Sequence, residues 1–335
     1  MRVFAYEHIT GGGMAEQALS SSIAHEGEMM SHALLVDLSS VPDVEVVTLR
    51  DQRLPPLDLP VTSFSVGTER EFAELFADCV EQSDAVWLVA PESGGVLEAL
   101  SRKVVAGHRI LLGSRPDAIH IAGSKLQTSR MLLLNGVPAA KTYYPDEKLP
   151  EVSQAWVVKP DDGAGCSDTR IFHDRDQALA WIATQNHAAR QYVMQPFIAG
   201  EACSLSVLCR EGSSRLLSCN RQRVVVRDNQ FYFLGSVVNS IDDPHGQLAG
   251  LAQQVASAMP GLWGYAGIDI ILTDEGPVVL EVNPRLTTSY AGMHASINYN
   301  PAALVLDLLT LPFPARTPHL AHTTVDVDVE PFSVH

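Results

Sequence analysis

The sequence predicts a protein of mixed α/β and α+β class, with an N-terminal domain on a parallel sheet followed by two α+β units. Two observations indicate this. In the first third of the chain, short apolar β-prone runs alternate with helical segments, as in parallel sheets covered by helices. Toward the end, β-prone runs follow one another with turn residues between them, which is typical of hairpins.

The first third supplies the elements of the parallel sheet. The predicted strands cover residues 2–6, 44–49, 85–91 and 109–112, and the predicted helices cover residues 15–38, 69–83 and 94–106. The glycine-rich turn TGGGM follows the first strand, and the proline-rich segment LPPLDLP is expected to be a surface loop. The segment GSRPDAIHIAGSK marks a change of unit near residues 113–120.

The rest of the chain is predicted to form a small α+β unit and a strand-rich unit. The small unit has helices at 125–135 and 176–184 and strands at 141–144, 155–160 and 191–197. The strand-rich unit contains CSLSVLC, LLSCNRQRVVV and QFYFLGSVVN, a helix at 248–258 and a hairpin at 267–285. The predicted domains are therefore 1–115, 116–196 and 197–315, and residues 316–335 are read as a tail or edge strand.

The composition narrows the class of protein. The 335 residues are 46% hydrophobic, which can fill real cores, and the formal net charge of −16 argues against nucleic acid or an anionic membrane as a partner. The five cysteines form no CxxC pair, so neither a disulfide framework nor a zinc site is predicted. We expect no signal peptide and no membrane-spanning segment, and we expect a reducing cytoplasmic location.

The segment GIDIILTDEGPVVLEVNPR places acids among apolar strand residues. Its Asp-Glu-Gly-Pro turn predicts a hairpin that brings Asp269 close to Glu281, and Asn283 shares a face with Glu281 because strand side chains alternate. Three oxygen donors on one side of a hairpin favour a Mg²⁺ or Mn²⁺ site completed by a nucleotide. Ordinary surface acids would explain Asp269 alone, but they explain the trio followed by Pro284 and Arg285 less well.

Two lysines upstream suit phosphate oxygens. Lys125 lies in AGSKLQT, and Lys159 ends the strand WVVKP, although such a lysine can also simply extend to solvent. The loop DDGAGCSD at 161–168 contains Gly163 and Gly165, and its backbone N–H groups could cover a phosphate chain. The loop matches neither the Walker motif nor the dinucleotide-binding glycine motif.

A third segment suits a nucleoside. In VMQPFIAGEACSLSVL, the residues Gln195, Pro196 and Phe197 end a strand and could offer donors and acceptors to an adenine, while Glu201 could accept from ribose hydroxyls. Arg221 and Arg223 are two residues apart and could form a second phosphate or carboxylate contact, or they could lie on a solvated strand face.

Taken in chain order, these features resemble the ATP-grasp superfamily over residues 115–310, and the N-terminal third resembles its pre-ATP-grasp domain. The resemblance implies that ATP is held between two α+β subdomains. The loop of residues 161–168 would close over it as a lid, and residues 195–201 would bind the adenosine. It assigns Lys125 and Lys159 to the phosphates, Asp269, Glu281 and Asn283 to Mg²⁺ (usually two ions), and catalytic roles to Lys159 and Arg285. Arg285 would hold the γ-phosphoryl group or acyl-phosphate oxygens, unless it is a structural bridge.

Within this superfamily, VFAYEHITGGGM, ALSRK and EVNPRLTTSYAGM resemble tyramine–L-glutamate ligases of methanofuran-type cofactor synthesis. This implies an amide between the γ-carboxylate of glutamate and tyramine, or tyrosine, formed through an acyl phosphate. Substrate contacts are then expected at Glu7, Gly11 to Gly13, Glu92, Ser93 and Thr287 to Ser289. Glu7 either pairs with an amine cation or caps its turn.

Two other functions stay open at this point. A kinase-like or carbamoyl-phosphate-type enzyme of the same superfamily would stop at the acyl phosphate or transfer phosphate to another acceptor. A nucleotide-sensing module without enzymatic activity would keep only the fold, and the complete set of charged residues argues against it. The expected partners are an amino acid and an amine, and a homodimer is left open.

Overall fold

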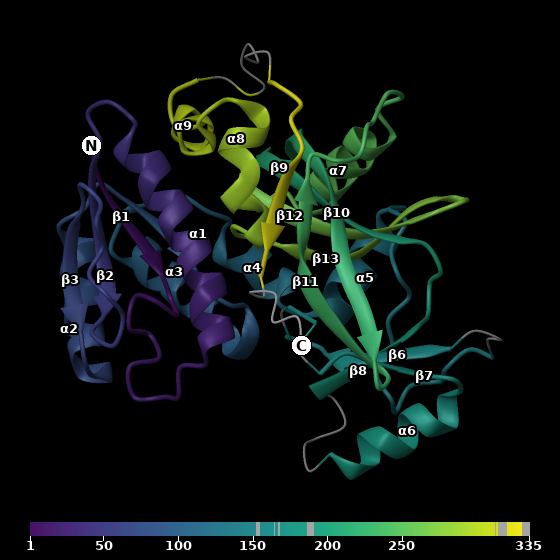
Figure 1. Ribbon diagram of the computed structural model, residues 1–335. Helices are drawn as coiled ribbons and strands as arrows, with labels where there is room; N and C mark the ends of the chain where they lie inside the picture. Colours follow the sequence, from purple (N-terminus) through teal and green to yellow (C-terminus); the bar gives the residue numbers. More distant parts are fainter. Residues whose placement is uncertain are drawn as a thin grey trace.

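The computed structural model describes residues 1–151, 155–163, 165–166, 168–185, 191–311, 313 and 320–329. Residues 164 and 167 of the predicted lid, and residues 316–319 and 330–335 of the predicted tail, lie outside this part of the chain. Figure 1 shows the N-terminal sheet domain on one side and the β9–β13 region beside it, with β6, β7, β8 and α6 at the lower end.

The N-terminal domain contains a five-stranded parallel sheet of order β3-β2-β1-β4-β5. Its elements are β1 Arg2–Glu7, α1 Ser21–Ser39, β2 Glu45–Asp51, β3 Thr62–Val66, α2 Glu69–Glu81, β4 Ala85–Val89, η1 Ser93–Gly95, α3 Val96–Ala106 and β5 Ile110–Leu111. The predicted parallel sheet is thus confirmed. α2 begins at a capping box in which Thr68 and Glu71 satisfy each other's backbone N–H groups.

The second sheet has nine strands and is antiparallel. Its main path is β13-β12-β9-β10-β11-β7-β6-β8, and β14 pairs with β11. The strands are β6 Trp156–Pro160, β7 Arg170–Phe172, β8 Tyr192–Pro196, β9 Glu201–Arg210, β10 Ser213–Arg227, β11 Gln230–Val238, β12 Gly264–Thr273, β13 Gly276–Asn283 and β14 Val325–Asp328. The helices are α4 Pro116–Ala122, α5 Lys125–Leu134, α6 Arg175–Thr184, α7 Gln247–Ala258, η3 Thr288–Gly292, α8 Met293–Ile297 and α9 Pro301–Asp307.

Several predicted elements are wrong in detail. The first helix begins at Ser21 rather than residue 15, because the glycine-rich turn continues and Ser20 caps the helix by accepting from the Ile23 N–H. β3 was not predicted, since four of its five residues are exposed and carry no apolar pattern. Residues 141–144 form no strand; Tyr143 makes only an isolated bridge to Met194. The helix α4 was not predicted; it lies in the segment predicted to mark a change of unit, and that boundary stays a prediction.

One hydrophobic core joins the two halves of the molecule. Leu34 and Leu38 of α1 belong to the same buried cluster as Tyr290, Met293 and Val305. α1 therefore packs against the parallel sheet with one side and against η3, α8 and α9 with the other. A separate cluster lies between α7 and strands β9, β10, β12 and β13. No helix in the described part of the chain is long and apolar enough to cross a membrane.

Polar contacts reinforce this junction. Asp37 on α1 is buried, and its Oδ1 lies 2.5 Å from His294 Nδ1 on α8. Asn300 donates to the Asp37 carbonyl at 2.8 Å and to Ser40 Oγ at 2.8 Å. Burial raises the pKa of Asp37, and the bond to His294 opposes that shift. The α1 helix is thus fixed to the C-terminal half by both apolar and polar contacts.

We predict that Asp37→Ala lowers the free energy of unfolding by about 1–3 kcal/mol, because His294 loses its buried acceptor. Urea denaturation followed by circular dichroism measures this change. Asp58→Ala, at an exposed position without a hydrogen bond to the described residues, is the control and should stay within about 0.5 kcal/mol of the parent protein. Equal stability of the two variants would contradict a structural role for Asp37.

Candidate active site

A cavity of about 200 Å³, partly open to solvent, lies between the small β6–β8 unit and strands β9 to β13. Most of the predicted site residues line it, although they come from distant parts of the chain. These residues are Lys125, Lys159, Gly163, Gly165, Gln195, Pro196, Phe197, Asp269, Glu281, Asn283 and Arg285. The fold therefore brings together the groups that the sequence suggested for a nucleotide and its metal.

The acids of the hairpin face this cavity rather than the core. Asp269 lies directly opposite Glu281, so the predicted closeness of the two acids is confirmed, and a register shift between Asp269 and Ile270 makes them direct partners. Their neighbours Ile268, Ile270 and Val282 are buried in the core beneath the sheet. Because strand side chains alternate, the polar residues project from the other face, where the Glu281 side chain is still 22% exposed. This placement avoids the cost of burying carboxylates in an apolar core.

Hydrogen bonds hold Asp269 in place. Asn283 donates through Nδ2 to Asp269 Oδ2 at 3.1 Å, and Gln222 on β10 donates to Asp269 Oδ1 at 2.8 Å. The Nδ2 of Asn283 is used in this bond, so its side-chain oxygen is available as a further acceptor. Gln222 was not predicted as a site residue; the alternation along NRQRVVV was the signal that could have found it.

The two carboxylates influence each other strongly. Burial and the charge of Glu281 raise the pKa of Asp269. Burial acts to raise the pKa of Glu281 as well, but the charges of Lys125 and Lys159 outweigh it and lower that pKa. Adjacent carboxylates of this kind are stabilised by a cation between them.

The donor set fits Mg²⁺ or Mn²⁺. Two carboxylates and an amide oxygen are hard ligands, and they leave coordination positions for water and phosphate, as Mg²⁺ prefers. Within the described ranges, no cluster of three or more His, Cys, Asp or Glu side chains forms a closed metal cage. The residues present therefore suit a metal that arrives with a phosphorylated ligand, rather than one held by the protein alone.

The two lysines face the acids from α5 and β6. Both side chains are largely buried, each residue being 7% exposed. Lys125 Nζ lies 3.5 Å from Glu281 Oε2 and donates to the Gly163 carbonyl. Lys159 makes no hydrogen bond or ion pair with the described residues, and burial lowers its pKa. Lys159 is thus a buried cation that can accept an anionic ligand.

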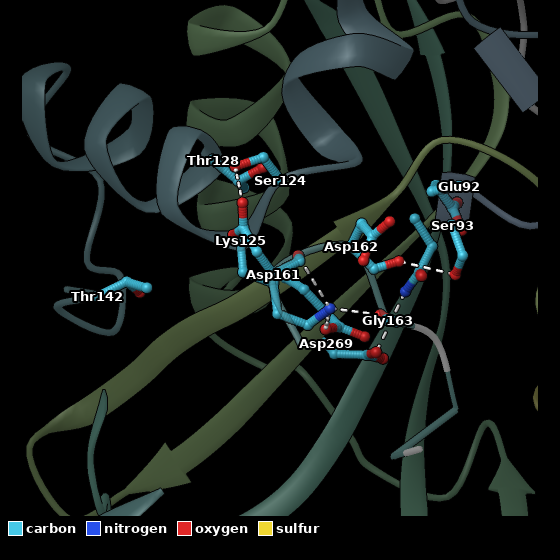
Figure 2. A network of polar contacts seen from close by, with 12 residues as sticks. Glu92, Ser93, Ser124, Lys125, Thr128, Thr142, Asp161, Asp162, Gly163 and Asp269 are labelled. Atoms are coloured by element: carbon cyan, nitrogen blue, oxygen red, sulfur yellow. Dashed lines mark hydrogen bonds and ion pairs between the residues drawn. The ribbon is translucent and has the colours of Figure 1, made fainter. Parts of the chain in front are cut away.

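The start of the predicted lid is tied to two elements (Figure 2). Asp161 accepts from Ser124 Oγ at 2.7 Å and from the Leu126 N–H at 2.9 Å, so it caps α5. Asp162 accepts from Ser93 Oγ through its carbonyl at 2.8 Å and from the Gly94 N–H through Oδ2 at 3.0 Å. Ser93, expected as a substrate contact, therefore holds the loop.

The cavity also has apolar lining residues, which suit a flat aromatic base. Val157, Phe197, Ile198, Phe233, Ile271 and Leu280 line it. Gln195 is 3% exposed and donates to Thr142 Oγ1 at 2.7 Å, so its side chain is already engaged. A backbone segment beside an apolar slot can still offer an N–H and a carbonyl to a ligand.

Two residues predicted to contact the nucleotide do not line the cavity. Glu201 forms an ion pair with Arg221 at the sheet surface. Arg223 lies on the opposite face of β10 from Gln222, where it donates to Asp326 at 3.0 Å and to Asp328 of β14. The sequence could not reveal these contacts, because they depend on which strands become neighbours.

Arg285 connects the hairpin to the N-terminal domain while it lines the cavity. Its Nε and NH2 donate to Glu92 Oε2 at 3.1 and 2.9 Å, and NH1 donates to the Leu286 carbonyl at 3.0 Å. The side chains of Arg285 and Glu92 are 12% and 8% exposed. Arg285 therefore has the structural contact that was its alternative role, and it remains able to meet a ligand.

The remaining expected substrate contacts separate into two groups. Thr287, Thr288 and Ser289 line the cavity. Glu7 does not; its carboxylate accepts from the Ile9 N–H at 3.0 Å, and from the N–H and hydroxyl of Thr10, each at 2.7 Å. Glu7 thus caps its turn. A Cβ at Gly13 would lie 2.1 Å from His8 Nδ1, so a packing constraint accounts for that glycine.

Comparison with known proteins agrees with this arrangement. The ATP-grasp domain model matches residues 122–289, which is half of the chain, and the pre ATP-grasp 3 domain model matches residues 44–119. The chain is 25% identical over 295 residues to the tyramine–L-glutamate ligase of Methanocaldococcus jannaschii, covering 87% of this chain and 84% of that protein. It is 23% identical over 233 residues to the D-alanine–D-alanine ligase of Pediococcus pentosaceus, covering 65% and 64%.

Among solved structures, an ATP-grasp superfamily protein from Archaeoglobus fulgidus has a TM-score of 0.71 and 21% identity, covering 98% of this chain and 100% of that chain. This likeness concerns the fold. Together with the family models and the cavity described above, it leads to one conclusion: the chain belongs to the ATP-grasp family and is an ATP-dependent ligase that forms carbon–nitrogen bonds.

Proposed function

We propose that this enzyme joins the γ-carboxylate of L-glutamate to tyramine, or to a closely related aromatic amine, with release of ADP and phosphate. The observation that carries this proposal is one cavity lined by the two lysines Lys125 and Lys159 together with Asp269, Glu281 and Asn283. The likeness of most of the chain to a tyramine–L-glutamate ligase supports the choice of substrates.

The proposed reaction has two steps. An oxygen of the acid substrate attacks the γ-phosphorus of ATP, and the bond to ADP breaks to give an acyl phosphate. The amine nitrogen then attacks the acyl carbon, phosphate leaves, and the nitrogen loses a proton to give the amide. The enzyme's contribution is to position the reactants and neutralise charge.

We assign the residues as follows. Lys125 and Lys159 neutralise phosphate oxygens, and Arg285 holds the transferred phosphoryl or acyl-phosphate oxygens. Asp269, Glu281 and Asn283 would hold Mg²⁺, most simply two ions, which as Lewis acids would offset charge on the phosphate groups. The apolar lining residues and the backbone at 195–197 would hold the adenosine. We also propose Gln222 as the residue that orients Asp269.

We also propose that the chain is divided into domains at residues 1–115, 116–196 and 197–315. The 161–168 loop would then belong to the small unit and close over the phosphates. Its first residues already contact α5 and η1, which supports a loop that spans the space between the units.

The first prediction concerns substrates. ADP release should require L-glutamate together with an amine, and tyramine should be the best of tyramine, tyrosine and dopamine. A coupled ADP assay measures this, with each substrate omitted in turn as control. Turnover with glutamate alone, with an acyl phosphate trapped by hydroxylamine and no stimulation by any amine, would instead favour a kinase-like enzyme.

The second prediction concerns the metal ligands. Glu281→Ala should lower the rate of ADP release about 10²-fold or more, because the charge on the phosphate groups is no longer offset. Glu275→Ala, at the exposed turn of the same hairpin, is the matched control and should keep the parental rate. Near-normal ADP release by Glu281→Ala would disprove the metal assignment.

The third prediction concerns phosphate binding. Lys159→Met should raise the Kd for ATP about tenfold or more, since a buried cation is removed from the phosphate oxygens. Isothermal titration calorimetry measures this Kd without turnover. Lys141→Met, at an exposed lysine, should bind ATP like the parent enzyme. An unchanged Kd for Lys159→Met would remove Lys159 from the nucleotide site.

A further inference from the structure

The cavity contains one acidic residue that the reaction described above does not use. Glu26, on the second turn of α1, lines the cavity, and every other described lining residue comes from position 125 or later. Glu26 is therefore the contribution of the N-terminal sheet domain to the cavity wall, as far as the described residues show. It carries no sequence signal, since it lies within an ordinary helical segment.

The fold holds Glu26 at this position. The next residue, Gly27, is buried, and a Cβ there would lie 2.8 Å from Glu7 Oε2 and 3.2 Å from Ile9 Cβ. α1 therefore approaches the turn after β1 closely, which any larger side chain at Gly27 would hinder. On its other side, α1 packs against η3, whose preceding and first residues, Thr287 to Ser289, also line the cavity.

The Glu26 carboxylate has no partner among the described residues. It makes no hydrogen bond or ion pair with them, although it is only partly exposed. Arg285 is the nearby cation, but its N–H groups are directed to Glu92 and to the Leu286 carbonyl. Burial raises the pKa of Glu26, and the charge of Arg285 opposes the shift. An unpaired, partly buried carboxylate is unfavourable unless a ligand compensates it.

A second group nearby is also unsatisfied. Glu92 is 9% exposed, and its Oε1 is buried without a hydrogen-bond partner, while its Oε2 accepts both bonds from Arg285. Glu26 and Glu92 both act on the charge of Arg285. Two carboxylates against one guanidinium leave this end of the cavity with net negative charge. The Arg285 guanidinium can still hold an anionic oxygen on its own side, but at the Glu26 oxygens an anion would be repelled, whereas a cation would be attracted.

We propose that Glu26 determines specificity by binding the primary ammonium group of a substrate at the Arg285 end of the cavity. This inference rests on the proposed function, in which both substrates carry such a group. The ammonium belongs either to the acceptor amine or to the α-position of glutamate, and both have the same chemistry: three N–H donors and one positive charge. An ammonium ion would satisfy the unpaired Glu26 oxygens and reduce the excess of negative charge.

The test compares each ammonium ligand with a neutral or truncated analogue by calorimetry on the full-length protein. Tyramine is paired with 4-(2-hydroxyethyl)phenol, which has a hydroxyl in place of the amine. L-Glutamate is paired with glutarate, which lacks the α-amino group. Phenethylamine, which lacks the phenol, reports whether Glu26 instead accepts a hydrogen bond from the phenolic hydroxyl. The variants are Glu26→Gln, Glu26→Asp and the control Glu28→Gln.

Glu28 is a suitable control because it lies on the same helix, pairs with Arg50 at 2.5 Å and does not line the cavity. In Glu26→Gln, we expect the Kd of one ammonium ligand to rise about tenfold and its preference over the analogue to be lost. The Kd for ATP and for the other substrate should change less than twofold. Glu26→Asp keeps the charge and should retain part of the preference, which also covers the case in which Glu26→Gln is unstable.

The ligands whose Kd rises in Glu26→Gln show which ammonium group Glu26 binds. A higher Kd for both tyramine and phenethylamine identifies the acceptor amine, and a higher Kd for L-glutamate identifies its α-ammonium group. Three results with Glu26→Gln overturn the inference: both ammonium ligands are still preferred over their analogues, the Kd rises for tyramine but not for phenethylamine, or the Kd rises equally for all ligands. The inference is also overturned if the parent enzyme binds neither ammonium ligand more tightly than its analogue. Turnover is measured separately. If Glu26→Gln turns over normally with unchanged KM values, the inference about Glu26 is wrong but the proposed function stands. If the parent enzyme binds an ammonium ligand through Glu26 but shows no turnover, only the proposed substrates are wrong.

Discussion

The balance of charge across the cavity is the constraint on which the rest of the structure depends. Asp269 and Glu281 lie opposite each other on two paired strands, and Lys125 and Lys159 face them from another part of the fold. Neither pair of charges would be stable at this degree of burial without the other, because the free energy lost on desolvating an isolated charge exceeds what its remaining contacts in the protein provide. The lysines lower the pKa of Glu281, whereas Asp269, next to Glu281, has a raised pKa. The protein thus compensates the acids only in part, and a nucleotide with Mg²⁺ would complete the balance.

This charge balance requires several separate elements to keep fixed positions relative to one another. Lys159 belongs to β6, Lys125 to α5 and the acids to the β12–β13 hairpin, and Asp161 fixes the loop after β6 to the start of α5. Arg285 extends the same network to Glu92 in the N-terminal domain, and α1 of that domain shares a hydrophobic core with η3, α8 and α9. The N-terminal domain is therefore part of the site, and Glu26 is the side chain through which it reaches the cavity.

Much of the site could be predicted from the sequence because it follows from local rules. The hairpin turn predicted that Asp269 lies close to Glu281, and alternation along the strand placed Asn283 on the same face; a shift in register between Asp269 and Ile270, which the sequence did not predict, makes the two acids direct partners. Arg223 and Glu201 were predicted as nucleotide contacts by the same kind of reasoning, but their neighbours come from β14 and β10. Gln222 was missed although the alternation along its strand could have revealed it, whereas Glu26 lies in an ordinary helical segment that carries no such signal.

The sequence by itself determined the classes of element, the acid-bearing hairpin, the lysines and the ATP-grasp family, because these depend on short-range periodicity, turn chemistry and the order of motifs along the chain. Only the tertiary structure decided that the acids face a cavity instead of the core, that Ser93 holds the lid loop and that Glu7 caps its own turn. It alone placed Glu26 of α1 beside Arg285, from more than 250 positions away in the chain. Such contacts depend on how sheets and helices pack, and packing is a property of distant surfaces that no local pattern encodes.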